Sequence, residues 1–304
     1  MDISNENKSS NKPFVSIIIP VYNRPNGVRD TLSSVVDQDY PKERYEILVV
    51  DNDSDDETPE VIEEFENNFS QLVKGLEETE IQSSYAARNR GIENAQGEVL
   101  VFLDADMWVE NDFLSVITDE FEEEDKKYLG IEVEVVAEKN TIVSCYTEHN
   151  AFQIERYVSK RHFAPTCSLA VSRDIFEEVG FFDKELISSG DYEFGNRVYE
   201  TGYDLYYTDR TKTYHPARDS FKSLMKKSFR IGRGSYQLSS KYPERYGKNK
   251  KNVFNLKHFL PDPPETLKRY IDYEVGMKKF CFAGIKWCDK IVKHIGYVYE
   301  KGRW

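Results

Sequence analysis

The stretch VLVFLDAD at residues 99–106 decides the fold of this chain. Five apolar residues follow the turn at Gly97-Glu98 and lead directly into two carboxylates, Asp104 and Asp106. An unbroken apolar run of this kind predicts a strand that is buried on both faces of a sheet. Because side chains alternate along a strand, Asp104 and Asp106 should point to the same side where that strand ends.

The close spacing of these aspartates supports two hypotheses. Two carboxylates so near each other repel unless a positive charge lies between them. A hard divalent cation such as Mg²⁺ binds oxygen ligands and keeps open positions for phosphate oxygens. Alternatively, the pair caps the following helix together with Glu110 and Asp112. A three-residue pattern does not separate these hypotheses, so the rest of the chain has to decide.

The chain before residue 106 alternates between strand and helix patterns. We expect strands at residues 14–19, 45–50, 71–77 and 99–103, and helices at 27–38, 58–69 and 85–95. In detail, Pro20 should end the first strand and Ser84 should cap the third helix. This alternation is typical of an α/β fold in which helices cover both faces of a parallel sheet.

Polar residues follow three of the predicted strands. They are the loop Pro20–Asn23, Asp51 and the aspartate pair. In parallel sheets covered by helices, ligands bind beyond the carboxyl ends of the strands. We therefore expect these three groups to line one cleft.

The pattern after residue 106 is less regular. We expect a helix at 111–121, strands at 128–136, 141–145 and 167–171, a helix from Arg173, a helix at 191–201, and short strands at 205–208 and 212–214. Residues from Asp219 onwards are helical and basic, with a break at Pro261–Pro264 and a long helical region at 265–299. The predicted organisation is a disordered tail at 1–12, an α/β domain at 13–218 and a helical basic extension at 219–304.

Composition narrows the class of protein. The chain has 304 residues, of which 39% are hydrophobic and 31% charged, as in soluble globular proteins. The polar start resembles no signal peptide, and no apolar run approaches the ~20 residues of a membrane span, so we expect a cytoplasmic protein or one attached to the cytoplasmic membrane face. Four scattered cysteines indicate reduced thiols.

The charge of the chain is unevenly distributed. The net charge of −13 argues against nucleic-acid binding. Acidic residues concentrate between residues 51 and 138, and basic residues concentrate between 212 and 257. This asymmetry favours a metal site in the first half and an anion-facing surface in the second.

Five stretches, in order and spacing, resemble family 2 glycosyltransferases, which are inverting, nucleotide-sugar-dependent enzymes of the GT-A fold. The stretches are VSIIIPVYN (15–23), ILVVDNDSDDET (47–58), ARNRGIENAQGEVLVFLDAD (87–106), SLAVSRDIFEEVGFFD (168–183) and SGDYEFGNRVYETG (189–202). The resemblance spans residues 15–215. It implies a mostly parallel, Rossmann-like sheet covered by helices, and sugar transfer from a UDP- or GDP-linked donor to a glycan or lipid-linked acceptor.

The resemblance also implies which residues bind the donor. Pro20, Tyr22 and Asn23 match the loop that lines the base and ribose pocket, Asp51 matches the carboxylate that binds the base, and Arg88 matches a donor-contacting arginine. A carboxylate suits this role because it accepts the N–H hydrogens of uracil or guanine. The alternatives are an Asx turn for Asp51 and a surface position for Arg88.

The aspartate pair matches the DxD motif of the family. The resemblance implies that Asp106 binds Mg²⁺ or Mn²⁺, while Asp104 reaches the ribose, or the metal through water. The metal would neutralise the diphosphate leaving group. His215 matches a late histidine that some GT-A enzymes use as a further metal ligand, and its alternative is a structural role.

Asp191 matches the aspartate of the family's ED motif, which implies the role of general base. Gly190 stands where the acidic partner of that motif is common, so Glu193 is a second candidate. Helical spacing separates the two side chains by about 200°, so only one should face the cleft. We favour Asp191, because a helix N-terminus should lower its pKa and keep it ionised. The alternative is a simple helix cap.

Two features of the basic half complete the predicted site. Arg218, Arg230 and Arg233 are candidates for neutralising the diphosphate or an anionic acceptor. Residues 277–299 form an amphipathic pattern that fits either a helix on a membrane surface or one packed on the catalytic domain. The membrane alternative would suit a lipid-linked acceptor.

Other classes of protein fit the sequence less well. A nucleotidyltransferase should carry a glycine-rich phosphate loop after the first strand, and a dehydrogenase should carry GxGxxG there, but the chain reads IIIPVYNRPN. A non-catalytic glycan- or partner-binding relative would not need Asp51, Asp104, Asp106 and Asp191 all to be present.

Overall fold

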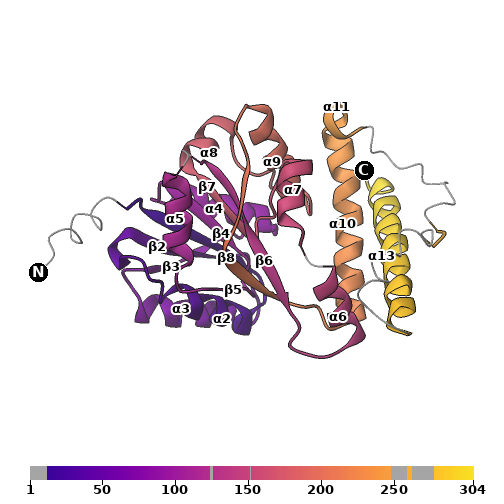
Figure 1. Ribbon diagram of the computed structural model, residues 1–304, viewed down its shortest axis with the longest axis horizontal. Helices are drawn as coiled ribbons and strands as arrows, with labels where there is room; N and C mark the ends of the chain where they lie inside the picture. The colour runs from indigo at the N-terminus through magenta and orange to yellow at the C-terminus, as the bar shows by residue number, and fades with distance from the viewer. Residues whose placement is uncertain (1–11, 124–125, 151, 248–258, 262–276) are drawn as a thin grey trace, which may run out of the picture. The chain divides into compact units, whose positions relative to one another are not determined.

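The computed structural model describes residues 12–123, 126–150, 152–247, 259–261 and 277–304 (Figure 1). The chain forms two compact units. The first comprises Met1–Glu134, Phe152–Glu185 and Gly190–His215, and the second comprises Val135–Ala151, Leu186–Ser189 and Pro216–Trp304. The predicted tail lies outside the described residues except for Lys12, whose carbonyl oxygen accepts a hydrogen bond from Arg44 Nε at 2.7 Å.

An eight-stranded sheet has the order β3-β2-β1-β4-β7-β6-β8-β5. Its strands are β1 (Val15–Val21), β2 (Tyr45–Asp51), β3 (Val73–Glu77), β4 (Val99–Leu103), β5 (Trp108–Val109), β6 (Tyr128–Val136), β7 (Ser168–Ser172) and β8 (Tyr206–Pro216). The first four strands pair in parallel, whereas β4 with β7, β6 with β7 and β5 with β8 pair antiparallel. The predicted α/β architecture is confirmed, but the sheet is mixed and is parallel only over its first half.

The helices divide between the units. The first unit holds α2 (Pro25–Val35), α3 (Thr58–Asn68), α4 (Ser84–Asn94), α5 (Phe113–Glu122), α7 (Ile154–Arg161), α8 (Arg173–Val179) and α9 (Gly190–Glu200), with a 3₁₀ turn, η1, at Lys42–Arg44. The second unit holds α6 (Ile142–His149), α10 (Phe221–Lys241), α11 (Pro243–Tyr246) and α13 (Met277–Lys301).

Alternation of side chains places helices on both faces of the sheet. Odd-numbered residues of the parallel strands, such as Ile17 and Val101, join one core with apolar residues of α2, α3 and α5. On the other face, Phe102 packs against Phe176 and Phe182 at centroid distances of 5.8 and 5.5 Å. This burial on both faces explains why the parallel strands read as continuous apolar runs.

The carboxyl end of β1 differs from the prediction, in which Pro20 ends the strand. β1 continues to Val21, and Pro20 lies opposite Val50 of β2. The pairing of β1 with β4 stops at Ile18. Pro20 therefore lies where β1 has only one neighbouring strand, and a proline is tolerated there.

Three local predictions were wrong, two of them in the irregular part of the chain. Residues 141–145 form the start of α6 rather than a strand, because Thr141 and Ser144 make a capping box in which each side chain accepts the other's backbone N–H, at 3.0 and 2.9 Å. The two short strands at 205–214 are a single strand, β8. The cap of α4 is Ser83 rather than Ser84.

The second unit is built on two neighbouring helices, α10 and α13 (Figure 1). Contacts advance along both helices in the same direction, so they run parallel: Ser228 bonds Asp289, and Arg233 pairs with Glu300 at 2.5 Å. A Cβ on Gly232 would lie 2.0 Å from the Lys293 carbonyl oxygen, so the glycine permits this close approach. One face of the predicted amphipathic segment 277–299 is thus packed against protein.

Gly91 sets the distance between α4 and the sheet. A Cβ at this position would lie 2.5 Å from Cγ2 of Ile18, which is fully buried in β1. We expect Gly91→Ala to lower the free energy of unfolding by about 1–3 kcal/mol, because the helix must move off its strand. Urea unfolding measures this change.

The control is Gly284→Ala in α13, where an added Cβ meets nothing within 4 Å. There the better helix propensity of alanine should stabilise by up to about 1 kcal/mol. A Gly91→Ala protein as stable as the wild type would show that the close approach of α4 is dispensable.

Candidate active site

The loops after β1 and β2 are joined at the carboxyl edge of the sheet. Asn23 N–H donates to Ser54 Oγ at 2.9 Å, and the Asn23 side chain exchanges two hydrogen bonds with Asp55, at 2.6 and 2.9 Å. Asn23 and Asp53 have φ angles of 49° and 65°, in the left-handed region that Asn and Asp tolerate. The chain can therefore turn at Asp53 without a glycine.

Asp51 lies at the end of β2 and is 8% exposed. Its Oδ1 accepts a hydrogen bond from Ser54 Oγ at 2.5 Å, and Oδ2 accepts one from Ser54 N–H at 3.4 Å. Burial raises the pKa of Asp51, and the bonds from Ser54 oppose this effect. Asp51 thus forms the turn that was its alternative role, while it stays at the edge where a ligand would bind. Beside it, Pro20 is buried and Tyr22 is 46% exposed.

Arg88 is a buried residue, which rules out the surface alternative. Its guanidinium is 4% exposed, and Nη2 donates to Asp104 Oδ1 at 2.5 Å. Nη1 donates to the Ser84 carbonyl oxygen at 3.3 Å. Within the described residues Nε has no hydrogen-bond partner. The Arg88 side chain therefore brings a positive charge from α4 to the first aspartate of the pair.

Asp106 is supported by the start of α2. Arg24 Nη1 lies 3.8 Å from Asp106 Oδ2, and the Asp106 side chain is 22% exposed. A Cβ on Gly27 would lie 2.4 Å from the Ala105 carbonyl oxygen, so only glycine lets α2 pack this closely on the aspartate loop. Thr31 Oγ1 also accepts a hydrogen bond from Met107 N–H at 3.2 Å.

The aspartate pair suits a hard divalent cation. Its donors are carboxylate oxygens, and Mg²⁺ in nucleotide enzymes is commonly held by one or two carboxylates together with phosphate oxygens. In the described residues no three His, Cys, Asp or Glu side chains gather as ligands. His215, on β8, is 9% exposed and packs on Phe152 at a centroid distance of 5.6 Å. The structure therefore does not bring His215 together with both aspartates.

Asp191 is the second residue of α9 and belongs to the same unit as the aspartate pair. Its Oδ1 accepts hydrogen bonds from Tyr192 N–H at 2.9 Å and from the Tyr85 hydroxyl at 3.4 Å. Arg88 and Asp104 are near enough to act on its charge. The carboxylate thus lies within electrostatic reach of Arg88 and Asp104.

The prediction that the helix N-terminus lowers the pKa of Asp191 was wrong. Burial raises this pKa, and the negative charge of Asp104 raises it further. The N–H of Tyr192 and the charge of Arg88 act in the opposite direction but are outweighed. A carboxylate of raised pKa is a stronger base than an exposed one, and perturbed values of this kind concentrate at functional sites.

Glu193 faces away from Asp191 and is fully buried. Arg197 donates to both of its carboxylate oxygens, with Nε to Oε1 at 2.9 Å and Nη2 to Oε2 at 3.0 Å. Arg197 also donates to the carbonyl oxygens of Val179 and Phe181. These bonds tie α9 to the turn that follows α8, which gives Glu193 a structural partner.

The three predicted basic residues belong to the second unit, around and within α10. Arg233 is paired with Glu300, and Arg230 is exposed. The Arg218 carbonyl oxygen accepts a hydrogen bond from Thr147 Oγ1 at 3.2 Å. None of these contacts tests a role in binding a diphosphate or an acceptor.

Tyr85, Arg24 and Ser54 are the site residues that sequence reasoning missed. Tyr85 precedes Arg88 by three positions, a spacing that puts two side chains on one helix face. That spacing was available in the sequence once Arg88 had been singled out. Nothing local in the sequence indicated the contacts of Arg24 and Ser54, because both depend on the folding of separate loops.

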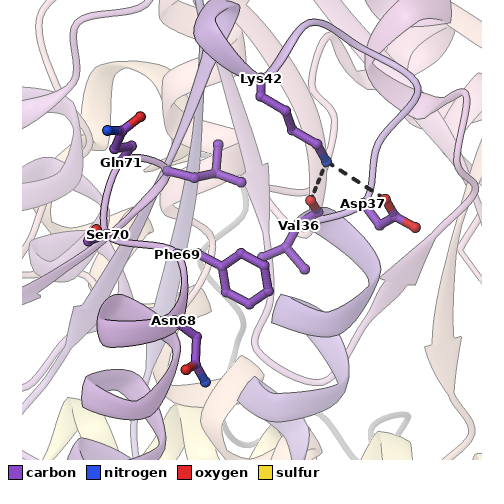
Figure 2. Close-up of a pocket in the computed structure, with 8 residues that line it drawn as sticks. Val36, Asp37, Lys42, Asn68, Phe69, Ser70 and Gln71 are labelled. Atoms are coloured by element: carbon purple, nitrogen blue, oxygen red, sulfur yellow. Dashed lines mark hydrogen bonds and ion pairs between the residues drawn. The ribbon is translucent and has the colours of Figure 1, made fainter.

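A surface hollow lies elsewhere on the first unit. Figure 2 shows it between the ends of α2 and α3, lined by Val36, Asp37, Lys42 and residues 68–72. Lys42 Nζ bonds the Val36 carbonyl oxygen and lies 3.8 Å from Asp37. Because α2 and α3 end at the amino ends of the strands, this hollow is distant from the predicted site, and no predicted site residue lines it.

The family model "Glycosyl transferase family 2" matches residues 16–180. Glycosyltransferase AglE of Haloferax volcanii is 36% identical over 298 residues, which cover 95% of this chain and 96% of that protein. The Methanococcus voltae dolichyl N-acetyl-α-D-glucosaminyl phosphate 3-β-D-2,3-diacetamido-2,3-dideoxy-β-D-glucuronosyltransferase is 27% identical over 72% of each chain. The chain belongs to glycosyl transferase family 2 and is a glycosyltransferase, as its motifs predicted.

Solved structures confirm the GT-A fold. The mannosyltransferase PcManGT from Pyrobaculum calidifontis, in complex with GDP-Man and Mn²⁺, matches 97% of this chain and 88% of its own length with a TM-score of 0.63 at 18% identity. S. aureus TarS 1–349, in complex with UDP-GlcNAc, matches 95% of this chain and 92% of its own length with a TM-score of 0.57 at 20% identity. Family membership excludes the nucleotidyltransferase and dehydrogenase alternatives.

Asp191 should reduce the stability of the protein at neutral pH. The pKa of Asp191 in the folded protein is raised above its ordinary value of 3.8, so ionising this carboxyl lowers the free energy of unfolding. This penalty is absent below the ordinary pKa, grows as the pH rises and is complete above the folded pKa. We expect Asp191→Asn to raise the melting temperature at pH 7, with a gain that vanishes near pH 4.

Glu193→Gln is the matched control, two residues along the same helix. It breaks a buried ion pair, so it should lower the free energy of unfolding by about 3 kcal/mol. Scanning calorimetry of both variants between pH 4 and pH 8 checks the prediction. An Asp191→Asn protein less stable than the wild type at pH 7 would contradict it.

Proposed function

We propose that the protein is an inverting glycosyltransferase that moves a sugar from a UDP- or GDP-linked donor to a hydroxyl group of a lipid-linked glycan. The observation that carries the proposal is the convergence on α4: Tyr85 contacts Asp191, while Arg88 contacts Asp104. A carboxylate of raised pKa therefore lies beside a carboxylate that fits donor binding. The enzyme would use Mg²⁺ or Mn²⁺.

The donor would bind at the joined loops after β1 and β2. Buried Asp51 offers acceptor oxygens to the N–H groups of the base, which suit uracil or guanine. Tyr22, nearly half exposed, offers a ring against which the base or ribose can pack. Relatives in the family were solved with GDP-Man and with UDP-GlcNAc, so either nucleotide is consistent with this edge.

Asp106 and Asp104 would hold the cation. When bound, a divalent cation neutralises the charge that develops on the diphosphate leaving group. Arg24 now lies near Asp106 and is exposed, so its guanidinium is free to turn toward the diphosphate. The buried guanidinium of Arg88 pairs with Asp104 and would hold its carboxylate in place. Lewis-acid and cationic groups would thus surround the phosphates.

Asp191 would act as the general base. It takes the proton of the acceptor hydroxyl while that oxygen attacks the anomeric carbon. The bond from the anomeric carbon to the diphosphate breaks in the same step, and the nucleoside diphosphate leaves. One displacement at one carbon inverts its configuration.

The class of acceptor is inferred from relatives. The name of the Methanococcus voltae protein specifies a dolichyl-phosphate-linked N-acetylglucosamine as acceptor. We propose an acceptor of the same chemistry, a sugar linked through phosphate to a polyprenyl chain. Arg218 and Arg230 remain candidates for contacting its phosphate, whereas Arg233 already pairs with Glu300.

Donor binding and turnover should separate at the two aspartates. We expect Asp106→Ala to abolish the part of the affinity for UDP-N-acetylglucosamine or GDP-mannose that depends on Mn²⁺, because a phosphate-bridging cation loses its carboxylate. Asp191→Asn should bind the donor like the wild type but turn over about 10²–10⁴-fold more slowly. Titration calorimetry with Mn²⁺ or with EDTA measures binding, and nucleoside diphosphate release measures turnover.

Asp112→Ala is the control, since Asp112 is an exposed carboxylate near the same loop and its side chain makes no cap bond in α5. It should change neither quantity. Unchanged Mn²⁺-dependent affinity in Asp106→Ala would remove the proposed metal ligand. Near-normal turnover in Asp191→Asn would remove the proposed base.

We propose that the side of α13 that carries Phe280 and Val298 rests on the membrane that carries the acceptor. None of the helices in the described part of the chain has the length and hydrophobicity that a bilayer crossing requires. Phe280 and Val298 are nevertheless 76% and 41% exposed and, at helical spacing, point in about the same direction. Phe282 and Glu300, which are buried, point about 180° away. Lysines 279, 286, 290 and 301 lie along one side of the exposed stripe and suit an anionic surface, and Lys290 Nζ also donates to the Leu260 carbonyl oxygen at 3.1 Å.

Vesicle binding tests this surface. The wild type should sediment with vesicles that contain phosphatidylglycerol, and less with pure phosphatidylcholine. Phe280→Ser combined with Val298→Ser should weaken binding at least about tenfold, because two apolar side chains no longer leave water. Phe69→Ser, an exposed aromatic residue of the first unit, is the control. Equal binding by the double variant and the wild type would refute the proposal.

A further inference from the structure

We propose that Tyr85 is a positioning residue for Asp191, and that α4 thereby fixes the general base relative to the donor-binding carboxylate Asp104. This inference rests on the proposed function, because it assigns Asp191 the role of base. It adds a residue that no sequence motif singled out. Three observations carry it: the bonds of the Tyr85 hydroxyl, the fit of its ring and the position of Arg88 on the same helix.

The Tyr85 hydroxyl joins the backbone and the side chain at the start of α9. Tyr85 is 6% exposed. Its oxygen accepts hydrogen bonds from Gly190 N–H at 2.9 Å and from Asp191 N–H at 3.4 Å. A phenol oxygen has two acceptor positions and one hydrogen. Two amides therefore fill the acceptor positions, and the hydrogen is directed to Asp191 Oδ1 at 3.4 Å.

This arrangement orients the base without neutralising it. The hydroxyl donates to one carboxylate oxygen, and Tyr192 N–H donates to the same oxygen at 2.9 Å. The second oxygen, Oδ2, makes neither of these bonds. Oδ2 is then the oxygen available to the acceptor hydroxyl. Fixing a reacting group in this way lowers the entropic part of the barrier.

Gly190 makes room for the tyrosine ring. A Cβ on Gly190 would lie 2.7 Å from Cε2 of Tyr85 and 2.8 Å from Cζ. The ring also packs on Phe182 at a centroid distance of 5.9 Å, so it cannot withdraw freely. The departure from the family's ED motif therefore has a physical counterpart: a side chain at position 190 would displace the ring that holds Asp191.

One face of α4 carries both contacts. Arg88 follows Tyr85 by three residues, and its Nη2 bonds Asp104 Oδ1 at 2.5 Å. The close approach of Gly91 to Ile18 holds this helix against strand β1. A rigid helix backbone thus links the base to the donor-binding carboxylate, and Tyr85 is the part of that link that reaches α9.

Tyr85→Phe tests the inference, because it removes the hydroxyl and keeps the ring. Turnover is measured as nucleoside diphosphate release from UDP-N-acetylglucosamine or GDP-mannose, with Mn²⁺ and dolichyl-phosphate-linked N-acetylglucosamine. We expect kcat to fall about 10- to 100-fold, as for a lost hydrogen bond to a charged group. The Kd of the donor and its KM should stay unchanged.

Tyr45→Phe is the matched control. Tyr45 is also a buried tyrosine of the first unit, 1% exposed, and its hydroxyl lies 3.3 Å from the carbonyl oxygens of Val35 and Val36. It begins β2, at the edge of the sheet opposite to the site. Tyr45→Phe should leave kcat unchanged, so a purely structural loss of a buried hydroxyl is distinguished from loss of positioning.

A double-variant cycle separates the inference from the function on which it rests. If Tyr85 acts through Asp191, Tyr85→Phe should slow the residual turnover of Asp191→Asn by less than twofold. The change in unfolding free energy of the double variant should also differ from the sum of the changes in Tyr85→Phe and Asp191→Asn. This measurement needs no substrate.

The outcomes are distinct. Near-normal turnover by Asp191→Asn overturns the proposed function, because the base would lie elsewhere. Slow turnover by Asp191→Asn with a normal Tyr85→Phe overturns only the positioning role. The positioning role is also overturned if Tyr85→Phe weakens donor binding, if Tyr45→Phe reduces kcat equally, or if the two unfolding changes add.

Discussion

The buried guanidinium of Arg88 is the interaction on which the candidate site depends. It supplies a positive charge, almost without solvent exposure, to a carboxylate at the end of the central strand β4. Without that charge, two aspartates two residues apart would repel each other before any ligand arrived. The Arg88 guanidinium is carried by α4, and α4 packs directly on β1 through Gly91. The packing of this helix on the sheet therefore also positions the charge in the site.

The carboxylates of the candidate site occupy different environments, and this difference supports the different roles proposed for them. Asp104 and Asp106 face the guanidinium groups of Arg88 and Arg24, as suits the role in metal binding proposed for them. Asp51 and Asp191 have pKa values raised by burial. Burying a charge costs stability, and proteins retain such groups where function requires them. Carboxylates whose environments push their pKa values apart are how enzymes assign different roles to like groups, and the roles proposed for Asp191 and for the aspartate pair follow this pattern.

The second unit follows a different physical rule. Its two parallel helices approach closely where glycines meet main-chain atoms, at Gly232 and Gly296. One face of α13 is used in this packing, and Arg233 and Gln237 bond Glu300 near the C-terminal end of the helix. The opposite face keeps large apolar side chains in solvent. The proposed contact with a membrane would use this exposed apolar face.

Hydrophobic periodicity determined much of the architecture from the sequence alone. Apolar runs located the parallel strands because those strands are buried on both faces, and the carboxylates after them identified the ligand-binding edge. Motif order identified the family and the candidate residues. The helical spacing of Asp191 and Glu193 also predicted that their side chains would point in different directions. In the structure, Glu193 forms an ion pair with Arg197.

Only the tertiary structure decided the properties that depend on residues distant in sequence. The antiparallel half of the sheet arises from pairings such as β4 with β7, which no local pattern encodes. The capping box at Thr141 turned an apparent strand into a helix. The pKa of Asp191 moved opposite to the local expectation, because burial by the surrounding elements outweighs the field of its own helix. Local sequence determines where the chain turns and which positions carry charged residues. The exclusion of solvent around those charges depends on the whole fold.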